Sequence, residues 1–260
     1  MSKLILPDIQ SLTDARHIPI RRVGIRNIRH PIIISNSEGL EQSTIAYWTL
    51  TVSLSAKEKG THMSRFMTLL ELYRKKVMTP FMFCEMSKNM LEMLSADCGD
   101  INAIFPYFIN KSAPVSKVKS LLDYEVKWIA RATNKEIEFE VVIQIPVTSL
   151  CPCSKAISKY GAHNQRSNIT ISLISSKEIK MEQIIRLVEN EASCELWSLL
   201  KRPDERYVTE YAYNNPKFVE DLVRDIAIRL NEQNDITWYR IEAENFESIH
   251  NHSAYAVIES

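Results

Sequence analysis

A thiol and an imidazole stand twelve positions apart in the middle of the chain, each inside a polar segment next to an expected strand. Cys151 belongs to Thr148-Ser-Leu-Cys-Pro-Cys-Ser-Lys155, and His163 belongs to Gly161-Ala-His-Asn-Gln-Arg-Ser167. Thiolate and imidazole are ordinary ligands of zinc and other transition metals. Buried cysteines are also common in protein cores. The pair alone therefore leaves a metal site and a structural role equally open.

Two further polar segments could complete such a site. Asp204-Glu-Arg206 follows Pro203, where it is expected to break out of a helix ending at Leu200, and Glu247-Ser-Ile-His-Asn-His252 lies between two expected C-terminal strands. A single carboxylate or histidine in a loop is usually only solvated. However, open catalytic metal sites take three protein ligands and leave one position for water. Three loops that offer Cys, His and Glu therefore favour a catalytic metal site.

Two other features could hold a substrate. Glu220 lies in a helical pattern, where it is either an acid on the exposed face or a buried carboxylate that accepts two hydrogen bonds from a guanine edge. Lys59, His62 and Arg65 join an expected strand to an expected helix. A helix N-terminus favours anions through its free N–H groups. A plain strand-to-helix turn is the alternative interpretation.

Apolar periodicity predicts the elements that position these residues. Period-two alternation indicates strands, and recurrence at helical spacing indicates helices. The expected strands cover 23–34, 46–54, 122–131, 137–147, 169–173, 236–244 and 254–258. The expected helices cover 62–75, 80–95, 184–200 and 218–230, while 99–118 is expected to be a connection. This order predicts an α+β fold of two similar modules, at about 15–148 and 149–260, with two strands, two helices and two strands in each.

Composition excludes several classes of protein. Thirty-two basic residues balance 32 acidic ones, which argues against a nucleic-acid binder because phosphate affinity needs a basic excess. The five glycines are too scattered for a Rossmann fingerprint or a P-loop. No apolar run approaches the ~18–20 residues of a membrane span, and the N-terminus lacks the apolar run of a secretory signal. Five irregularly spaced cysteines do not resemble a disulfide framework. We therefore expect a cytoplasmic protein.

Several motifs in this order resemble the type IB GTP cyclohydrolases, and the resemblance covers nearly the whole chain. The matching segments are Leu6-Pro-Asp-Ile-Gln10, Lys59-Gly-Thr-His-Met-Ser-Arg-Phe66, Ser149-Leu-Cys-Pro-Cys-Ser-Lys155, Gly161-Ala-His-Asn-Gln-Arg-Ser167 and Asn245-Phe-Glu-Ser-Ile-His250. The resemblance implies a bimodular tunnelling fold of two ββααββ modules, with antiparallel sheets and helices on one face. It also implies a homotetramer with active sites at subunit interfaces. The implied reaction converts GTP to 7,8-dihydroneopterin triphosphate and formate, at the entry to folate biosynthesis.

The resemblance also implies roles for individual residues. Cys151, His163 and Glu205 are similar to the ligands of one divalent metal per active site, while Glu247 and His250 are similar to its neighbours that handle water and protons. The division of the metal shell among Glu205, Glu247 and His250 stays open. Zinc, manganese and iron all suit this donor set.

The substrate residues follow from the same resemblance. Glu220 is similar to the anchor of the guanine ring, and the candidates for the triphosphate are Lys59, His62, Arg65, Lys155 and Arg166. In the expected mechanism, water whose pKa a metal lowers from ~15.7 towards ~7 attacks C8 of guanine. His250 then protonates a ring nitrogen as the ring opens.

Three alternatives remain. The first is a related cyclohydrolase that ends at a cyclic phosphate of dihydroneopterin. The second is another tunnelling-fold enzyme, such as a deazaguanine nitrile reductase, which would use a cysteine nucleophile and NADPH without a metal. The third is a non-catalytic nucleotide-binding module stabilised by zinc, for which GTP would bind without the appearance of a pterin.

Overall fold

A computed structural model describes residues 8–10, 12–178 and 180–260. Two compact units make up the chain. The first comprises the chain up to Ser35, Ser43–Phe105 and Trp128–Phe139, and the second comprises Asn36–Gln42, Pro106–Lys127 and Glu140–Ser260. Each unit is therefore discontinuous in the sequence. The division into modules at about residue 148 stays a prediction. None of the described helices is both long enough and apolar enough to span a bilayer.

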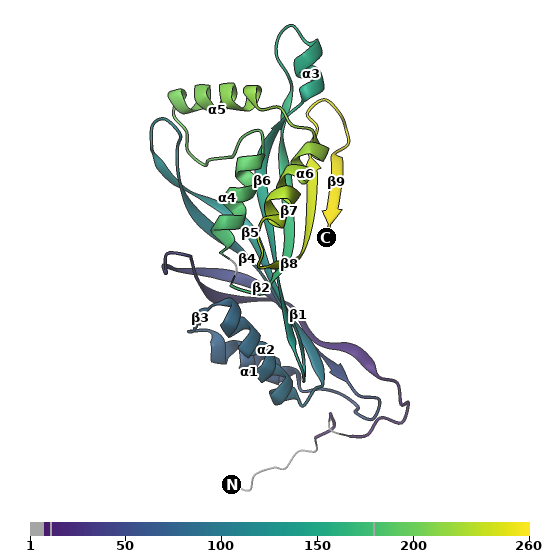
Figure 1. The fold of residues 1–260 in the computed structure, drawn as a ribbon. Coiled ribbons are helices and arrows are strands. Elements are labelled where there is room, and N and C mark those ends of the chain that lie inside the picture. Colours follow the sequence, from purple (N-terminus) through teal and green to yellow (C-terminus); the bar gives the residue numbers. More distant parts are fainter. Residues whose placement is uncertain (1–7, 11, 179) are drawn as a thin grey trace. The chain divides into compact units, whose positions relative to one another are not determined.

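The first unit contains β1, β3, most of β2 and parts of β4, β5 and β6, which are hydrogen-bonded in the order β3-β1-β2-β4-β5-β6. Their bounds are β1 Ile20–Ser35, β2 Glu41–Leu54, β3 Val77–Met78, β4 Cys98–Ser112, β5 Lys119–Thr133 and β6 Ile137–Leu150. Helices α1 (Met63–Tyr73) and α2 (Pro80–Leu94) contact each other, as Figure 1 shows. Phe83 of α2 is buried between Trp48 and Trp128, with ring centroids 6.0 and 5.6 Å away. The short β3 pairs parallel to β1, which departs from the antiparallel pattern.

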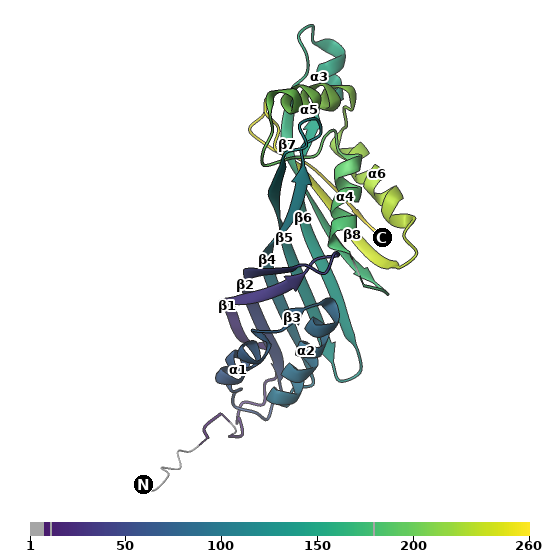
Figure 2. The same ribbon diagram turned by 90° about the vertical axis from the view of Figure 1, so that its left-hand side faces the viewer.

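The second unit contains the other parts of β4, β5 and β6, followed in the pairing order by β7 Asn164–Ser175, β8 Ile236–Asn245 and β9 Ala254–Glu259. Its helices are α3 Pro152–Ile157, α4 Met181–Glu191, α5 Arg202–Asn214 and α6 Val219–Asn231. Helices α4 and α6 lie on one face of the strands (Figures 1 and 2). They bury the apolar residues that predicted them, such as Ile185, Val188, Leu222 and Ile226. An amphipathic helix on a sheet face is how such a unit closes its core.

The element order confirms the predicted fold class. Apart from the short β3 and the helices α3 and α5, the chain reads two strands, two helices and two strands, twice. Helix α2 begins at the expected proline, and the Thr79 hydroxyl caps it by accepting a hydrogen bond from the Met82 N–H at 3.2 Å. Such a cap satisfies one of the free N–H groups at a helix start.

Three predicted elements are wrong. The expected connection at 99–118 is largely strand β4, whose buried side chains Ile101, Ala103, Phe105 and Tyr107 alternate along it. Gly99 and Pro106 are poor strand formers and obscure this alternation in the sequence. The register of the strand is fixed by antiparallel pairing with β2.

The expected helix over 184–200 ends at Glu191, where Ala192 turns to extended backbone with ψ 167°. Cys194 then forms an antiparallel bridge with Thr148, which removes Leu196–Leu200 from the helix. The expected loop at Asp204–Arg206 is instead the first turn of α5. Pro203 opens this helix, as proline does at a first turn, rather than ending the one before it.

Candidate active site

The candidate site forms where the ends of β6, β7 and β8 meet in the second unit. Antiparallel pairing places Leu150 of β6 opposite Asn164 of β7, and Ser167 of β7 opposite Asn245 of β8. Cys151 directly follows β6 and His163 directly precedes β7. The Cys151 N–H donates to the His163 carbonyl at 3.1 Å, so two residues twelve positions apart become neighbours.

Cys151 is held by the start of α3. It is the N-cap of this six-residue helix, and its Sγ accepts a hydrogen bond from the Ser154 N–H at 3.4 Å. The Ser154 hydroxyl donates to the Cys151 carbonyl at 3.2 Å and accepts from the His163 N–H at 3.2 Å. Ser154 therefore ties the thiol loop to the histidine loop through backbone groups.

His163 has polar groups gathered around one of its ring nitrogens. Its Nδ1 lies 2.9 Å from Gln165 Oε1, 3.5 Å from Ser248 Oγ and 3.9 Å from Glu247 Oε2. The His163 and Glu247 side chains are only 13% and 14% exposed. The structure thus places the Cys151 loop beside the His163 backbone and the Glu247 carboxylate beside the His163 ring. The predicted convergence of these loops on one metal stays a prediction.

Gln165 and Ser248 were not among the predicted site residues. Gln165 is 8% exposed and stands two positions after His163. Residues two apart on a strand point to the same face. The position of Gln165, two residues after His163 at the start of β7, is the signal in the sequence for this neighbour. Ser248 lies in a loop, for which periodicity gives no prediction.

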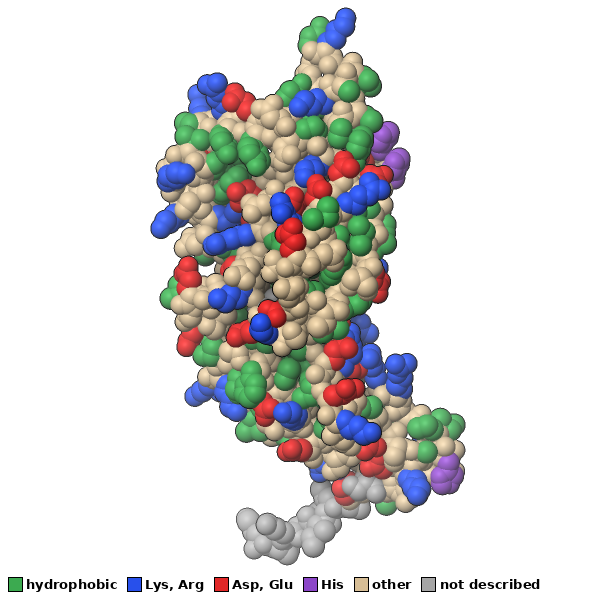
Figure 3. Space-filling model, viewed as in Figure 1, with side chains coloured by type: hydrophobic (Ala, Val, Ile, Leu, Met, Phe, Trp, Pro, Cys, Tyr) green, Lys and Arg blue, Asp and Glu red, His purple; other side chains and the backbone are tan. Residues whose placement is uncertain are grey.

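His250 lies on the loop that joins β8 to β9, exposed to solvent together with His252. The two imidazole rings are stacked, with centroids 4.9 Å apart and planes inclined by 14°. Figure 3 shows histidine side chains at the surface beside this loop. The role of His250 in proton transfer stays a prediction.

Glu205 and Glu220 are both exposed, in the first turns of α5 and α6 respectively. Glu220 is thus an exposed acid in the single chain, and its role as the anchor of the guanine ring stays a prediction. Within the described part of this single chain, no group of three or more His, Cys, Asp and Glu side chains is placed to hold a metal ion. The ligand set of Cys151, His163 and Glu205 accordingly stays a prediction.

Asp204, next to Glu205, anchors α5. Its fully buried carboxylate accepts hydrogen bonds from the N–H groups of Val115, Ser116 and Lys201, each at 2.8 Å, and from the Ser116 hydroxyl at 2.6 Å. Burial alone would raise the pKa of this carboxyl, but these four donors outweigh it and lower the pKa. Asp204 therefore fixes the helix that carries Glu205.

Two of the predicted triphosphate residues, Lys155 and Arg166, lie in the second unit. Lys155 Nζ donates to the Tyr213 carbonyl in the last turn of α5 and lies 4.5 Å from the centre of the Tyr213 ring. A cation at a helix C-terminus satisfies a free carbonyl. The Arg166 side chain is exposed on β7, and its backbone carbonyl accepts from the Phe246 N–H at 3.0 Å.

Lys59, His62 and Arg65 lie in the first unit, at the expected junction of a strand with a helix. His62 is the N-cap of α1, and its Nε2 lies 3.4 Å from Asp8 Oδ2. Arg65 Nη1 donates to the Met93 carbonyl in the last turn of α2 at 2.8 Å. The predicted position of these residues at a helix start is confirmed, whereas their role in substrate binding stays a prediction.

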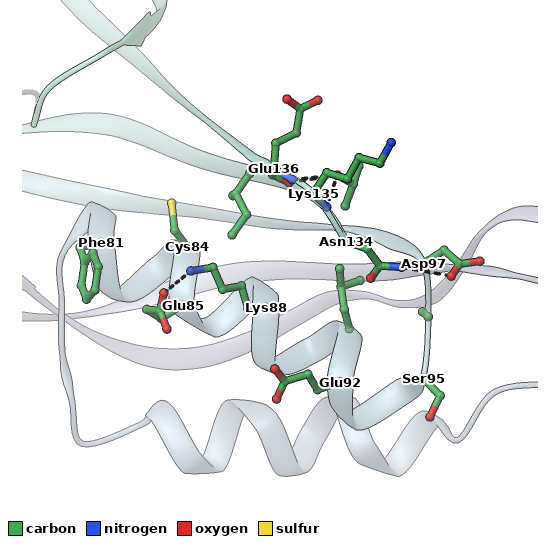
Figure 4. Close-up of a pocket in the computed structure, with 14 residues that line it drawn as sticks. Phe81, Cys84, Glu85, Lys88, Glu92, Ser95, Asp97, Asn134, Lys135 and Glu136 are labelled. Atoms are coloured by element: carbon green, nitrogen blue, oxygen red, sulfur yellow. Dashed lines mark hydrogen bonds and ion pairs between the residues drawn. The ribbon is translucent and has the colours of Figure 1, made fainter.

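A pocket of about 770 Å³ lies elsewhere in the first unit, between α2 and the β5–β6 hairpin (Figure 4). Lys88 pairs there with Glu85 at 2.6 Å, and Asn134 donates to Asp97 at 3.2 Å. None of the predicted site residues lines this pocket. We therefore place the candidate site at the strand ends.

Comparison with known proteins supports both the fold and the family. The uricase from Arthrobacter globiformis superposes with a TM-score of 0.52 over 92% of each chain at 10% sequence identity, which shows the tunnelling fold alone. The family described as type I GTP cyclohydrolase folE2 matches residues 6–256. A GTP cyclohydrolase FolE2 from Bordetella petrii is 66% identical over 98% of this chain and 97% of its own length. One from Paraburkholderia xenovorans is 56% identical over 98% and 95%. The chain therefore belongs to the type I GTP cyclohydrolase FolE2 family, the type IB family that its motifs resembled.

Proposed function

We propose that this chain is a metal-dependent hydrolase that converts GTP to 7,8-dihydroneopterin triphosphate and formate, the first step of tetrahydrofolate biosynthesis. The supporting observations are the family to which the chain belongs and the surroundings of His163, where the Cys151 N–H donates to the His163 carbonyl and Glu247 Oε2 lies 3.9 Å from the His163 ring. A thiol, an imidazole and a carboxylate are side chains that can hold a metal and move protons.

The donor set fits one divalent metal. Cys151 and His163 are adjacent, and the described hydrogen bonds and ion pairs of the His163 ring all involve Nδ1, which leaves Nε2 for a ligand bond. Glu205 would be the third ligand. Zinc, manganese and iron each accept this mixture of donors. When bound, the metal supplies a Lewis acid that lowers the pKa of water to ~7.

Glu247 and His250 would handle the protons. Glu247 is 14% exposed and 3.9 Å from the His163 ring, so it can accept a proton from the water that attacks C8 of guanine. His250 stands on the same loop three residues later and would protonate a ring nitrogen as the C8–N9 bond opens. A histidine suits this step because its ordinary pKa of ~6.5 lies near neutral pH.

Glu220 would orient the guanine ring. Its exposed carboxylate in the first turn of α6 can accept two N–H groups of the base. Lys59, His62, Arg65, Lys155 and Arg166 would contact the triphosphate. Arg65 and Lys155 already donate to backbone carbonyls, so each would have to share or exchange that hydrogen bond on binding.

The proposal includes a homotetramer with active sites at subunit interfaces and a location in the cytoplasm. The exposure of Glu205 and Glu220 supports interfacial sites, because both carboxylates remain open to groups from another copy of the chain. The described part of one chain assembles no three-ligand group, which favours the same arrangement.

The test is to treat the protein with chelator, add back zinc, manganese or iron(II), and follow formate and pterin together after addition of GTP. Metal-dependent release of both products, with the triphosphate retained, supports the proposal. A cyclic phosphate product would point to the related cyclohydrolase. Binding of GTP without formate under every metal would instead indicate a non-catalytic module and overturn the proposal.

A further inference from the structure

A buried, uncharged cluster lies directly beneath His163 and consists of Ser149, Gln165 and Ser167, called here the serine–glutamine cluster. These residues are 1%, 8% and 0% exposed. Gln165 Nε2 donates to Ser149 Oγ at 2.8 Å, and the Ser167 and Ser149 hydroxyls are 2.9 Å apart. The proposed reaction uses none of these side chains.

The cluster is built into the register of two strands. Ser149 of β6 and Gln165 of β7 are direct cross-strand partners. Ser167 follows Gln165 by two positions, so both side chains point to the same face. Sheet pairing and burial therefore hold the Gln165 amide in place, with its oxygen 2.9 Å from His163 Nδ1.

The chemistry of the neighbouring groups decides which ring nitrogen of His163 bears the hydrogen. An amide oxygen only accepts hydrogen bonds, and an ionised carboxylate likewise only accepts them. Gln165 Oε1 at 2.9 Å and Glu247 Oε2 at 3.9 Å both face His163 Nδ1, while the Ser248 hydroxyl, which can donate or accept, is farther from it than Gln165 at 3.5 Å. The reversed amide would require a bare Nδ1 lone pair to face the Glu247 carboxylate, which is electrostatically unfavourable. Nδ1 therefore bears the hydrogen, and Nε2 carries the lone pair.

We propose that Gln165 is a positioning residue that, anchored by Ser149, fixes His163 in the tautomer whose Nε2 can bind a metal. Some groups orient a metal-binding histidine by a hydrogen bond to its other ring nitrogen. Mutation of such a group typically lowers metal affinity or activity 10–100-fold. The inference rests on the proposed function where it makes His163 a ligand. The tautomer itself can be measured without metal or substrate.

The first measurement uses metal-free protein labelled with ¹⁵N-histidine, at a pH of about 8.5, where an ordinary imidazole is neutral. The ¹⁵N shifts of the two ring nitrogens distinguish the tautomers, and His163→Gln identifies the signals by their loss. We expect wild-type His163 to be protonated at Nδ1. If wild-type His163 is protonated at Nε2 instead, that result by itself overturns the inference, whatever the variants show.

The variants separate hydrogen bonding from packing. Gln165→Met keeps the approximate volume but removes the acceptor, so we expect a mixture of tautomers and cobalt(II) binding about ten- to a hundredfold weaker. Gln165→Glu keeps an acceptor and should hold the Nδ1–H tautomer, with affinity within severalfold of wild type. Equal cobalt(II) affinity of Gln165→Met and wild type, or equal weakening in both variants, would contradict the role.

Gln42→Leu is the matched control. Gln42 also uses both ends of its amide, donating to the Phe108 carbonyl at 2.7 Å and accepting from the Phe108 N–H at 3.0 Å. This change should leave the His163 tautomer and cobalt(II) affinity unaltered. If wild type shows the Nδ1–H tautomer but binds no divalent metal, the proposed function fails and the positioning of His163 stands.

Discussion

The second unit contains two largely buried polar clusters, one made of uncharged side chains and the other mainly of charged ones. The serine–glutamine cluster is neutral and ends at His163, which is partly exposed. The other, called here the lysine cluster, consists of Lys111, Tyr124, Glu189 and Glu195. Lys111 Nζ lies 2.7 Å from Glu189 Oε1 and 2.5 Å from Glu195 Oε2, and the Tyr124 hydroxyl donates to Glu189 at 2.7 Å.

In the lysine cluster, the Lys111 ammonium pairs with both carboxylates. Burial raises the pKa of Glu189, although Lys111 and Tyr124 oppose that shift. The same burial, with the adjacent Glu189 carboxylate, raises the pKa of the Tyr124 hydroxyl. By contrast, the serine–glutamine cluster contacts the His163 ring at Nδ1, and the described interactions of that ring leave Nε2 available. The difference suggests that a closed charged cluster serves the fold, whereas an open neutral cluster can orient a reactive group.

Cys151→Ala should have the largest effect, and the effect should be on the reaction and not on stability. We expect formate release from GTP to fall to the level of a protein-free control, because the proposed metal loses its sulfur ligand. Thermal unfolding should change little, since Cys151 is only half-buried and its main hydrogen bonds use backbone atoms. Near-normal turnover in this variant would remove Cys151 from the mechanism.

Lys111→Met should have the reverse effect. The substitution leaves Glu189 buried without its cation, which typically costs about 3–5 kcal/mol of unfolding free energy. Denaturant unfolding measures this loss. The double variant Lys111→Met with Glu189→Leu should recover much of it, because a well-packed apolar pair can replace a buried ion pair. An unchanged unfolding midpoint in the single variant would show that the lysine cluster does not stabilise the fold.

Glu220→Gln should have a smaller effect, and only on the reaction. Loss of a charged acceptor for the guanine N–H groups corresponds to about 1.5–3 kcal/mol, or roughly ten- to a hundredfold in kcat/KM. Stability should be unchanged because this side chain is exposed. Steady-state kinetics with GTP measure the effect, and Glu232→Gln on the exposed residue after α6 is the control. Equal kinetics for both variants would exclude an anchoring role for Glu220.

Acid titration of stability should give the smallest effect and tests the buried Asp204 carboxylate. The pKa of Asp204 is lowered in the folded state, so its contribution is present above the unfolded value of ~3.9 and is lost as pH falls through the folded value. We expect wild-type stability to decline below about pH 4 more steeply than that of Asp204→Asn. Denaturant unfolding measures the unfolding free energy at each pH. If it falls equally steeply below pH 4 in both proteins, this assignment is contradicted.

Much of the fold could be predicted from alternating apolar residues. The β5–β6 hairpin, α2 and α6 lie where the periodicity placed them, because burial of one face imposes a period of two or 3.6. The misplaced segments have specific causes. Gly99 and Pro106 obscure the alternation of β4, and Pro203 starts helix α5, although proline in a sequence can equally mark the end of a helix.

The sequence by itself determined the loops that carry Cys151, His163 and Glu247, because they follow or precede clear strands. Only the tertiary structure decided that Gln165 faces His163 Nδ1 and that Glu189 and Asp204 are buried. Periodicity reports which face a side chain occupies. The partner of a polar group depends on strand register and on segments far away in the chain, which no local pattern encodes.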